Sequence, residues 1–378
     1  MSDKARIGIS GTGFIARQLL RALARTSDLE PTAVLSRRPV ADLGDVPLAP
    51  MLTNAVADLV ERCDLVVECS GDPIHTADVV AAAFGRGLPV VTMNTEFHVT
   101  CGSAFVGQGW LSEAEGDQPG CTAALARDVR AMGFTPLVYG NMKGFLNHHP
   151  TPDDMAYWGG RQGISLEQVT AFTDGTKVQM EQALLANGCG ASILRQGLVG
   201  VPGSDRVAAA RELGRMAEAH GSPVADYILE RGHPPGVFVT ATADPAEADA
   251  LRYYKMGEGP HYVFERPYHL CALEIAKTIR EALLGATPLL NNGPRPTVSV
   301  AAIAKRDLAA GERIARGMGG FDLRGEAVLA EAAPGHVPLG IVLDGVVRRP
   351  VAAGAILGWD DMELPDSLAL RLTRRLFD

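Results

Sequence analysis

The sequence lacks the features that mark membrane, secreted and nucleic-acid-binding proteins. No apolar run is long enough to span a membrane, and the first expected strand begins at Arg6, which leaves no room for a signal peptide. The net charge of −9 disfavours nucleic acid as a partner. The cysteines are scattered without a Cys-x-x-Cys pair, which favours reduced thiols in a cytoplasmic protein over a disulfide or zinc framework; they are Cys63, Cys69, Cys101, Cys121, Cys189 and Cys271.

The first part of the chain, residues 1–142, alternates short apolar runs with helical stretches. This alternation predicts a parallel sheet with helices on both faces, an α/β fold of the Rossmann type. The expected strands are Arg6–Ser10, Thr32–Ser36, Asp64–Cys69, Pro89–Met93 and Phe134–Gly140. The expected helices are Phe14–Thr26, Asn54–Arg62, Ile74–Gly85 and Gly120–Met132.

Residues 143–290 mix strands with longer helices, which predicts an α+β domain; we expect 266–285 to pack back as a helix. The expected elements are strands Gln168–Phe172 and Gly236–Thr242 and helices Thr176–Asn187, Ser204–His220 and Tyr268–Leu284. The stretch Thr287–Pro296 is rich in Pro, Gly and Asn and predicts a linker. With 378 residues and about 150 residues per domain, two or three domains are expected.

An internal repeat follows the linker. "KRDLAAGERI" (Lys305–Ile314) matches "RRPVAAGAIL" (Arg348–Leu357), and in both copies Ala-Ala-Gly follows a short strand pattern. No long helix separates the copies. The repeat predicts a small all-β module with two related halves over residues 295–378.

The clearest motif is "RIGISGTGFIA", in which an expected strand runs into Gly11-x-Gly13-x-x-Ala16 and then into a helix. Gly11 permits a tight turn, Gly13 allows a pyrophosphate to approach the backbone, and Ala16 allows close packing of helix and strand. The motif predicts a dinucleotide site whose turn residues are Gly11, Thr12, Gly13, Phe14 and Ile15.

The end of the second strand bears on the choice of cofactor. NAD enzymes usually place an acidic residue there, but this chain has Ser36, Arg37 and Arg38. An arginine fork suits a 2′-phosphate, so we expect NADP(H) in preference to NAD(H). The alternative is that both arginines are solvated surface residues.

Small polar residues follow the third and fourth strands. In open α/β sheets ligands bind at the carboxyl ends of strands, so Ser70, Gly71, Asn94 and Thr95 are expected near the ribose and nicotinamide. For Asn94, a turn-forming asparagine is the alternative.

The stretch "GNMKGFLNHHPTP" (Gly140–Pro152) places Lys143 where a substrate would meet the nicotinamide. A lysine there can polarise a carbonyl or hold a phosphate or carboxylate; the alternative is a solvated lysine. Asn141 and Asn147 are candidate substrate contacts. His148 and His149 are adjacent and make a poor pair of metal ligands, so we expect loop residues.

The stretch "FTDGTKVQMEQALLANG" (Phe172–Gly188) predicts a turn and then a helix, with Asp174, Lys177 and Glu181 spaced by three and four residues on one face. Lys177 can serve as the proton donor or acceptor that a nicotinamide enzyme needs. The same residues can instead anchor a polyol, bind Mg²⁺ or Mn²⁺ through the carboxylates, or form an exposed ion pair. Tyr268 and His269 are expected in the first turn of a later helix, either lining the same site or packed structurally.

These stretches together resemble the homoserine-dehydrogenase-like oxidoreductases with a C-terminal SAF domain, and among them the deoxyxylulose-phosphate-reductoisomerase-like branch. The resemblance rests on Gly11-Thr12-Gly13 and on "EGDQPG", "NMKGF", "TDGTK", "RPYHL" and "AKRDLAAGE". It implies a Rossmann domain, an α+β domain for substrate binding and homo-oligomerisation, and a small β-clip module. By position, it implies that Lys143, Asp174, Lys177 and Glu181 line the pocket.

The homoserine dehydrogenase pattern around its catalytic aspartate and lysine is not evident here, so homoserine is not the expected substrate. We expect an NADP-dependent oxidoreductase acting on a small polar carbonyl or hydroxyl compound, such as a sugar phosphate or sugar acid. The alternatives are a metal-assisted reductoisomerase of a ketose phosphate and a nucleotide- or sugar-binding protein without turnover.

Overall fold

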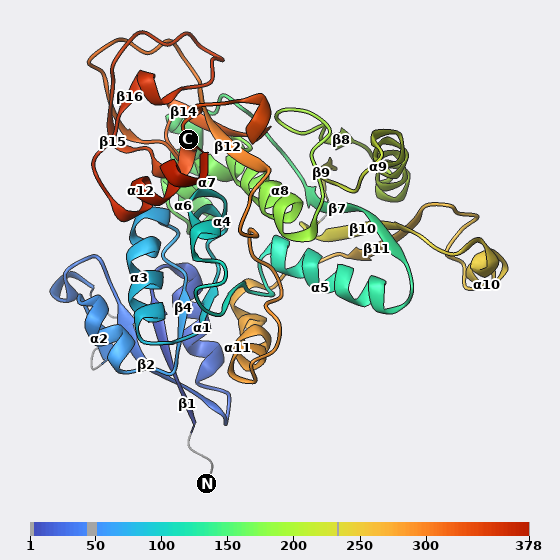
Figure 1. Cartoon of the computed structure of the whole chain (residues 1–378), viewed down its shortest axis with the longest axis horizontal. Helices are drawn as coiled ribbons and strands as arrows, with labels where there is room; N and C mark the ends of the chain where they lie inside the picture. Colours follow the sequence, from blue (N-terminus) through green and yellow to red (C-terminus); the bar gives the residue numbers. More distant parts are fainter. Residues whose placement is uncertain (1–3, 44–50, 233, 378) are drawn as a thin grey trace.

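The computed structural model describes residues 4–43, 51–232 and 234–377 of the chain. Over this part the chain forms a six-stranded sheet, a five-stranded sheet and two small sheets of two and three strands. Figure 1 shows the first sheet at the N-terminal end, the second sheet beside it, and the C-terminal strands stacked over α3 and α4. The molecule is therefore an α/β protein with additional sheets.

The six-stranded sheet has the order β3-β2-β1-β4-β5-β6, and every neighbouring pair is parallel. This confirms the expected Rossmann-like sheet. Its strands are β1 (Ala5–Ser10), β2 (Leu29–Leu35), β3 (Leu52–Thr53), β4 (Leu65–Glu68), β5 (Val90–Thr92) and β6 (Leu111–Glu113). The helices between them are α1 (Phe14–Leu23), α2 (Val56–Glu61), α3 (Pro73–Gly85) and α4 (Thr95–Thr100).

Both faces of this sheet are buried, as the near-continuous apolar strands require. In β1, Ile7 and Ile9 belong to the same buried core as α1 and the late helix α11 (Ile275–Leu283). Gly8 points to the opposite face, where a Cβ atom would lie 2.8 Å from the Cys63 Sγ atom. The period of two in the strand thus places α1 and α11 on one face and α2 and α3 on the other.

One expected strand belongs to another sheet. The stretch Phe134–Gly140, expected as the last strand of the first sheet, lies in β7 (Thr135–Lys143) at the centre of the second sheet. The sixth strand of the first sheet is β6, which the sequence analysis did not identify. A three-residue strand carries almost no periodicity, and an apolar run does not reveal which sheet it joins.

The second sheet has the order β11-β10-β7-β9-β8 and mixes parallel with antiparallel pairs. Helices α5 and α8 cover one face and α9 covers the other (Figure 1). The remaining elements here are β8 (Val201–Pro202), β9 (Val224–Leu229), β10 (Val237–Thr242), β11 (Tyr262–Arg266), α5 (Gln118–Ala131), α6 (Pro152–Gln162), α7 (Leu166–Thr173), α8 (Thr176–Cys189), α9 (Arg206–His220) and α10 (Ala248–Tyr253).

Two expectations for this part are wrong. Gln168–Phe172, expected as a strand, lies in α7, which begins with a capping box of Ser165 and Gln168. The helix expected over Tyr268–Leu284 begins only at Ile275. Before Ile275 the segment forms only a short 3-10 helix at Cys271–Leu273. An α-helix cannot run through Cys271, because its amide donates to the Gly116 carbonyl (3.0 Å) and its φ is +39°.

The C-terminal part, which we call the C-terminal module (residues 298–377), contains two small antiparallel sheets. They are formed by β12 (Val298–Ala304) with β14 (Leu323–Leu329), and by β13 (Arg313–Arg316), β15 (Leu343–Val347) and β16 (Met362–Glu363). The two copies of the repeat pair directly, since Leu308 and Val351 exchange backbone hydrogen bonds of 2.8 and 3.0 Å. The module is not all-β, because it ends in α12 (Leu368–Phe377), which packs on α3.

None of the helices in the described part of the chain is both long and apolar enough to cross a membrane. All six cysteines lie in that part, and none of them is disulfide-bonded.

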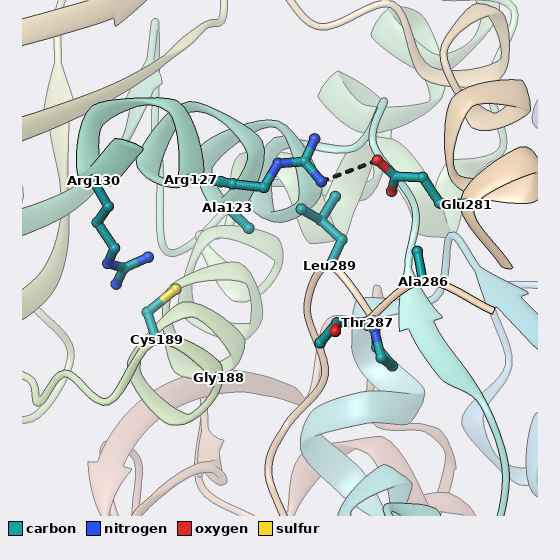
Figure 2. Close-up of a pocket in the computed structure, with 10 residues that line it drawn as sticks. Ala123, Arg127, Arg130, Gly188, Cys189, Glu281, Ala286, Thr287 and Leu289 are labelled. Atoms are coloured by element: carbon teal, nitrogen blue, oxygen red, sulfur yellow. Dashed lines mark hydrogen bonds and ion pairs between the residues drawn. The ribbon is translucent and has the colours of Figure 1, made fainter. Parts of the chain in front are cut away.

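A surface cavity of about 480 Å³ opens at the C-terminal ends of α5 and α8 (Figure 2). Its walls include Arg127 and Arg130 from α5, Cys189 from α8, Glu281 from α11 and the loop 286–289. Arg127 is already paired with Glu281 at 3.0 Å (Figure 2). The predicted catalytic residues Lys177 and Glu181 lie towards the opposite, N-terminal end of α8, so this cavity is separate from them.

Candidate active site

Gly11 and Gly13, in the turn between β1 and α1, have different structural roles. Gly11 has a φ of +116°, and a Cβ atom there would lie 2.9 Å from the Cys69 carbonyl oxygen, so the fold requires glycine. Gly13 precedes α1, and a Cβ atom there would meet nothing within 4 Å. Ala16 is fully buried against the sheet. The turn therefore leaves open space at the helix N-terminus, as a pyrophosphate site needs.

Beneath this turn, the Glu68 carboxyl group joins the ends of β1 and β4. It accepts hydrogen bonds from the Ser10 hydroxyl (3.3 Å), the Ser70 amide (2.8 Å) and the Asn94 side-chain amide (3.0 Å). Burial raises the pKa of Glu68, although hydrogen bonds from Ser70 and Asn94 act in the opposite direction. Glu68 thus fixes the strand ends that surround the expected cofactor site.

The residues after β2 lie beside the glycine-rich turn. Ser36 is buried, and its hydroxyl accepts the Arg38 amide (3.1 Å). Arg38 donates to the Thr12 hydroxyl (3.2 Å), and Arg37 forms an ion pair with Asp72. Arg38 is therefore placed against the expected phosphate-binding turn, whereas Arg37 is partly neutralised.

Asn94 and Thr95 lie at the start of α4, and both are buried. Asn94 accepts the Phe97 amide (3.1 Å) and donates to Glu68 and to Thr76 (2.8 Å), so its side chain is engaged within the protein. The capping role agrees with the turn-forming alternative. Ser70 and Gly71 follow β4, where Gly71 has a φ of +70°.

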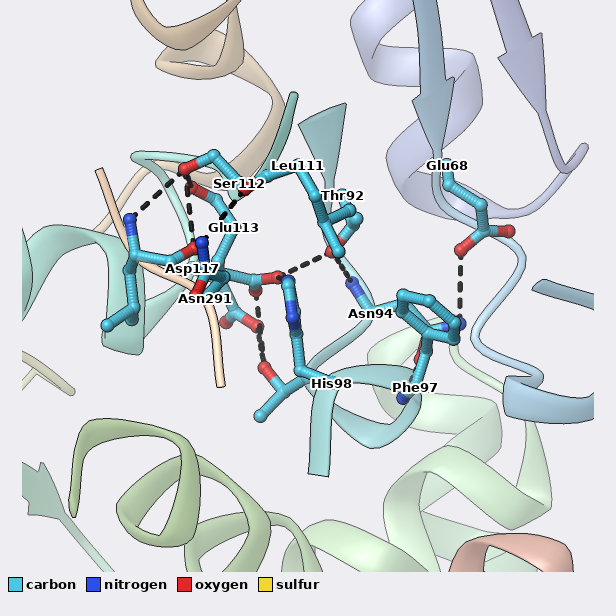
Figure 3. A network of polar contacts seen from close by, with 12 residues as sticks. Glu68, Thr92, Asn94, Phe97, His98, Leu111, Ser112, Glu113, Asp117 and Asn291 are labelled. Carbon is cyan, nitrogen blue, oxygen red and sulfur yellow. Dashed lines mark hydrogen bonds and ion pairs between the residues drawn. The ribbon is translucent and has the colours of Figure 1, made fainter. Parts of the chain in front are cut away.

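A second network lies at the end of β6 (Figure 3). Glu113 accepts the Thr92 hydroxyl (2.7 Å) and the Thr95 hydroxyl (3.2 Å), and it lies 3.5 Å from the His98 Nε2 atom. The distance is that of an ion pair, but burial raises the pKa of Glu113 well above its ordinary value and lowers that of His98 to about 3. His98 is therefore neutral near pH 7, and neither of its ring nitrogens has a hydrogen-bond partner in the described part of the chain.

Lys177 lies next to this network, near the start of α8. Its Nζ atom is 3.1 Å from Glu96 and 3.3 Å from Asp117, and these three side chains are 11–16 % exposed. Burial alone would lower the pKa of Lys177, but the charges of Asp117 and Glu96 raise it well above its ordinary value. Burial would likewise raise the pKa of Asp117, but Lys177, His269 and Lys143 hold it below its ordinary value. Lys177 and Asp117 are therefore ionised.

Lys143 and Glu181 form a neighbouring pair. The Lys143 Nζ atom lies 2.7 Å from Glu181 and also donates to Gln118. Glu181 accepts the Asn141 side-chain amide (2.7 Å), and the Asn141 carbonyl oxygen is buried without a partner among the described residues. The end of β7 and the first turns of α8 thus bring together Lys143, Lys177, Glu181 and Asn141, as the sequence predicts.

Asp174 faces another direction. It is fully buried, and its carboxylate binds Lys305 of the C-terminal module at 2.6 Å. The spacing of three and four residues does not place it beside Lys177, because α8 begins only at Thr176 and Asp174 ends α7.

Tyr268 and His269 lie in the irregular segment before α11 rather than in a helix. Tyr268 is half exposed beneath the Arg266 guanidinium, and His269 Nδ1 lies 3.0 Å from the Pro235 carbonyl oxygen. The charge of His269 acts on Asp117, so His269 borders the cluster. Asn147 donates its backbone amide to Thr173 (2.7 Å) and supports the loop before α6.

The sequence analysis missed four residues of this site: Glu96, Glu113, Asp117 and Gln118. Asp117 and Gln118 lie in the quoted "EGDQPG" stretch, where Asp117 caps α5 and accepts the Gln118 amide (3.0 Å). An acidic residue before Gln-Pro-Gly is a helix-start pattern, and that pattern could have placed Asp117 at a strand-to-helix junction. Among the described residues, no three His, Cys, Asp or Glu side chains are grouped as metal ligands.

Two family models of oxidoreductase domains match parts of the chain. Residues 11–99 match the family model of the homoserine dehydrogenase NAD-binding domain. Residues 116–275 match the model described as oxidoreductase DRL, catalytic domain. The second match begins one residue before Asp117 and spans Lys143, Lys177 and Glu181. A search of the curated proteins found no match.

Several solved dehydrogenase structures resemble the chain at low identity. A probable dehydrogenase from Thermotoga maritima is 14 % identical with a TM-score of 0.45, covering 76 % of this chain and 91 % of the other. A putative myo-inositol dehydrogenase from Sinorhizobium meliloti is 14 % identical (TM-score 0.40; 75 % and 91 %). UDP-N-acetylglucosamine 3-dehydrogenase from Acidithiobacillus ferrooxidans is 11 % identical (TM-score 0.43; 77 % and 92 %). At these values no substrate follows from the likeness.

Both matching family models describe parts of oxidoreductases, and one of them describes the part that binds NAD. The open glycine-rich turn and the ionised lysine lie within the matched regions. The chain is therefore an NAD(P)-dependent oxidoreductase.

Proposed function

We propose that the protein transfers hydride between NADP(H) and a small polar carbonyl or hydroxyl compound, such as a sugar phosphate or sugar acid. The observation that carries the proposal is the position of Lys177, which is bound to Glu96 and Asp117 and lies beside the Lys143–Glu181 pair. A bound nicotinamide would supply or accept the hydride. The protein must then supply or accept one proton at the substrate oxygen.

Lys177 is suited to that proton transfer. As an ammonium group, the form that its raised pKa favours, it can donate a proton to the oxygen of a carbonyl during reduction. Asp117 and Glu96 hold the Nζ atom in place and stabilise its charge. Lys143 is the second cation of the cluster and can polarise the same carbonyl or hold an anionic group of the substrate.

The composition of the cluster supports a hydroxylated substrate that carries an anionic group. Carboxylates such as Glu96 and Glu181 accept hydrogen bonds from hydroxyl groups, and lysines bind phosphate or carboxylate. The side-chain carbonyl oxygen of Asn141, which has no partner among the described residues, offers a further acceptor.

The preference for NADP(H) is supported by Arg38, which lies against Thr12 in the glycine-rich turn, and by the lack of an acidic residue at positions 36–38. An arginine at this place suits a 2′-phosphate. The triple variant Ser36→Asp/Arg37→Ala/Arg38→Ala tests the preference, since it replaces the positive group with the acid typical of NAD enzymes.

The experiment is a fluorescence titration of wild type and triple variant with NADPH and with NADH. We expect tighter NADPH binding in the wild type and a selective loss of about tenfold or more in the variant, equal to about 1.4 kcal/mol. Sugar phosphates and sugar acids are then screened by NADPH consumption, with and without Mg²⁺ or Mn²⁺. Tighter NADH binding that is unchanged in the variant would contradict the NADP preference. Binding of neither cofactor would contradict the oxidoreductase function.

A further inference from the structure

The turn before α8 is anchored by a buried ion pair from the far end of the chain. The Lys305 Nζ atom lies 2.6 Å from the Asp174 carboxylate and 2.7 Å from the Gly320 carbonyl oxygen. The side chains are 4 % and 0 % exposed. The other oxygen of Asp174 accepts the Thr176 amide at 2.9 Å, which is the first amide of α8. Lys305 therefore neutralises the carboxylate that ends one helix and begins the next.

Two more hydrogen bonds tie the same turn of α8 to β14. The Gly325 amide donates to the Thr176 hydroxyl (3.0 Å), and the Ala327 amide donates to the Gln179 side chain (2.8 Å). A Cβ atom on Gly325 would lie 3.3 Å from the Thr176 Cγ2 atom, so helix and strand are in close contact. The C-terminal module thus holds the first turn of α8 at three points.

The anchored face and the reactive face lie on opposite sides of the helix. Thr176 and Gln179 are three residues apart on one side, whereas Lys177 and Glu181 are four residues apart and lie roughly 150° around the axis, at 100° per residue. The C-terminal module therefore contacts the face of α8 that carries Thr176 and Gln179, whereas Lys177 and Glu181 lie on the other face.

We propose that Lys305 is a positioning residue for the active site: by binding Asp174 it sets the start of α8 and thereby the places of Lys177 and Glu181. The inference rests on the proposed function of Lys177. It gives the C-terminal module a part in catalysis although the contacts of Lys177 and Glu181 described above come from other elements. A displacement of about 1 Å at a reacting group can lower turnover by about 100-fold, so the loss of this anchor has a measurable effect.

The test uses the full-length protein with Lys305→Met and the double variant Asp174→Asn/Lys305→Met. The single variant leaves a buried carboxylate without its cation. The double variant removes both charges, but the side-chain carbonyl oxygen that Asp174→Asn introduces can still accept the Thr176 amide, so the start of α8 is held. Arg349→Met is the control, because it breaks an ion pair with Asp361 in the same module that does not involve α8.

For Lys305→Met we expect kcat to fall by about tenfold or more, NADPH affinity to stay within about twofold of wild type, and hydrogen–deuterium exchange to increase in residues 174–181. The double variant should recover most of the lost turnover and exchange protection. Arg349→Met should change neither. Unchanged exchange over 174–181 in Lys305→Met, or an equal effect of Arg349→Met, would overturn the proposal. If the wild type shows no turnover with any substrate, the proposed function fails, and the exchange data still decide whether Lys305 holds α8.

Discussion

Two lysine–carboxylate groups meet at the start of α8, and they differ in charge balance and exposure. Lys177 faces two carboxylates, Glu96 and Asp117, at 3.1 and 3.3 Å, and is 12 % exposed. Lys305 faces one carboxylate, Asp174, at 2.6 Å, and is 4 % exposed. The Lys177 group has two negative charges for one positive charge and is partly exposed to solvent. The Lys305 group has one charge of each sign and is buried.

This difference in charge balance and exposure indicates that the two lysines have different roles. A cation held by two partly exposed carboxylates can release or exchange a contact when a substrate arrives. A buried one-to-one pair is costly to break, since each charge left alone keeps its desolvation penalty. We therefore assign proton transfer to Lys177 and the positioning of α8 to Lys305, although both are lysines bound to carboxylates near the start of α8.

The largest expected effect is on turnover in Lys177→Met. Loss of a general acid or base typically lowers the rate by about 10²- to 10⁴-fold, so we expect a decrease in kcat of about 10³-fold. NADPH affinity, measured by fluorescence, should change by less than about twofold because the cofactor turn lies elsewhere. Lys277→Met is the matched control: Lys277 also binds two carboxylates but is 55 % exposed. If Lys177→Met retains a tenth of wild-type turnover, Lys177 is not the acid–base residue.

The next effect is on stability in Asp174→Ala. The substitution leaves Lys305 buried and unpaired, so the free energy of unfolding should decrease by about 3–5 kcal/mol, measured by urea denaturation. Asp366→Ala is the control, because it breaks an ion pair with Arg371 in which both side chains are more than half exposed. That change should cost about 1 kcal/mol or less. Equal losses in the two variants would remove the distinction between a supporting pair and a surface pair.

In the glycine-rich turn, Gly11 is expected to support the fold and Gly13 to make room for the cofactor. Gly11→Ala should lower the free energy of unfolding by about 1–3 kcal/mol because of its positive φ and its contact with Cys69. Gly13→Ala should change it by about 1 kcal/mol or less but weaken NADPH binding by about tenfold, since the new methyl group enters the open space. Denaturation and fluorescence titration of both variants check this. Unchanged NADPH affinity in Gly13→Ala would place the pyrophosphate elsewhere.

The smallest effects concern the pH dependence of stability in two neighbouring acids. The pKa of Glu113 is raised in the folded protein, so its contribution is present below its ordinary pKa and is lost as pH rises through the folded value. Glu113→Gln should therefore gain stability relative to wild type as the pH rises above the ordinary pKa of a glutamic acid.

Asp117 should behave in the opposite sense. Its pKa is lowered, so its contribution is present above its ordinary pKa and is lost as pH falls through the folded value. The deficit of Asp117→Asn relative to wild type should therefore shrink in acid. Urea denaturation over a pH series measures both variants. If the free energy of unfolding relative to wild type changes with pH in the same way in both variants, Glu113 and Asp117 do not differ in charge state.

The sequence was most informative where one local pattern determines the structure. The strand, the glycines and the buried Ala16 of the first turn follow from hard steric limits, and the turn appears as predicted. The spacing of Lys177 and Glu181 places both in one cluster with Lys143. The site residues Glu96 and Asp117 were not predicted, because they come from other elements and meet Lys177 only through the tertiary fold.

Asp174 shows the limit of the helical-face argument. Its partner, Lys305, lies 131 residues further along the chain, and no local pattern links the two. The strand β7 shows the same limit at the level of the fold, since its apolar run predicted a strand correctly but not the sheet to which it belongs. Contacts between distant segments determine both outcomes.

The most direct test of the account is to measure turnover and unfolding on the same preparations of Lys177→Met and Lys305→Met. We expect a crossed pattern: the loss of turnover is at least about ten times larger in Lys177→Met, and the loss of unfolding free energy is larger in Lys305→Met. If Lys305→Met instead loses more turnover than Lys177→Met, or if both variants lose turnover only in proportion to stability, the division between a reactive and a supporting lysine is wrong.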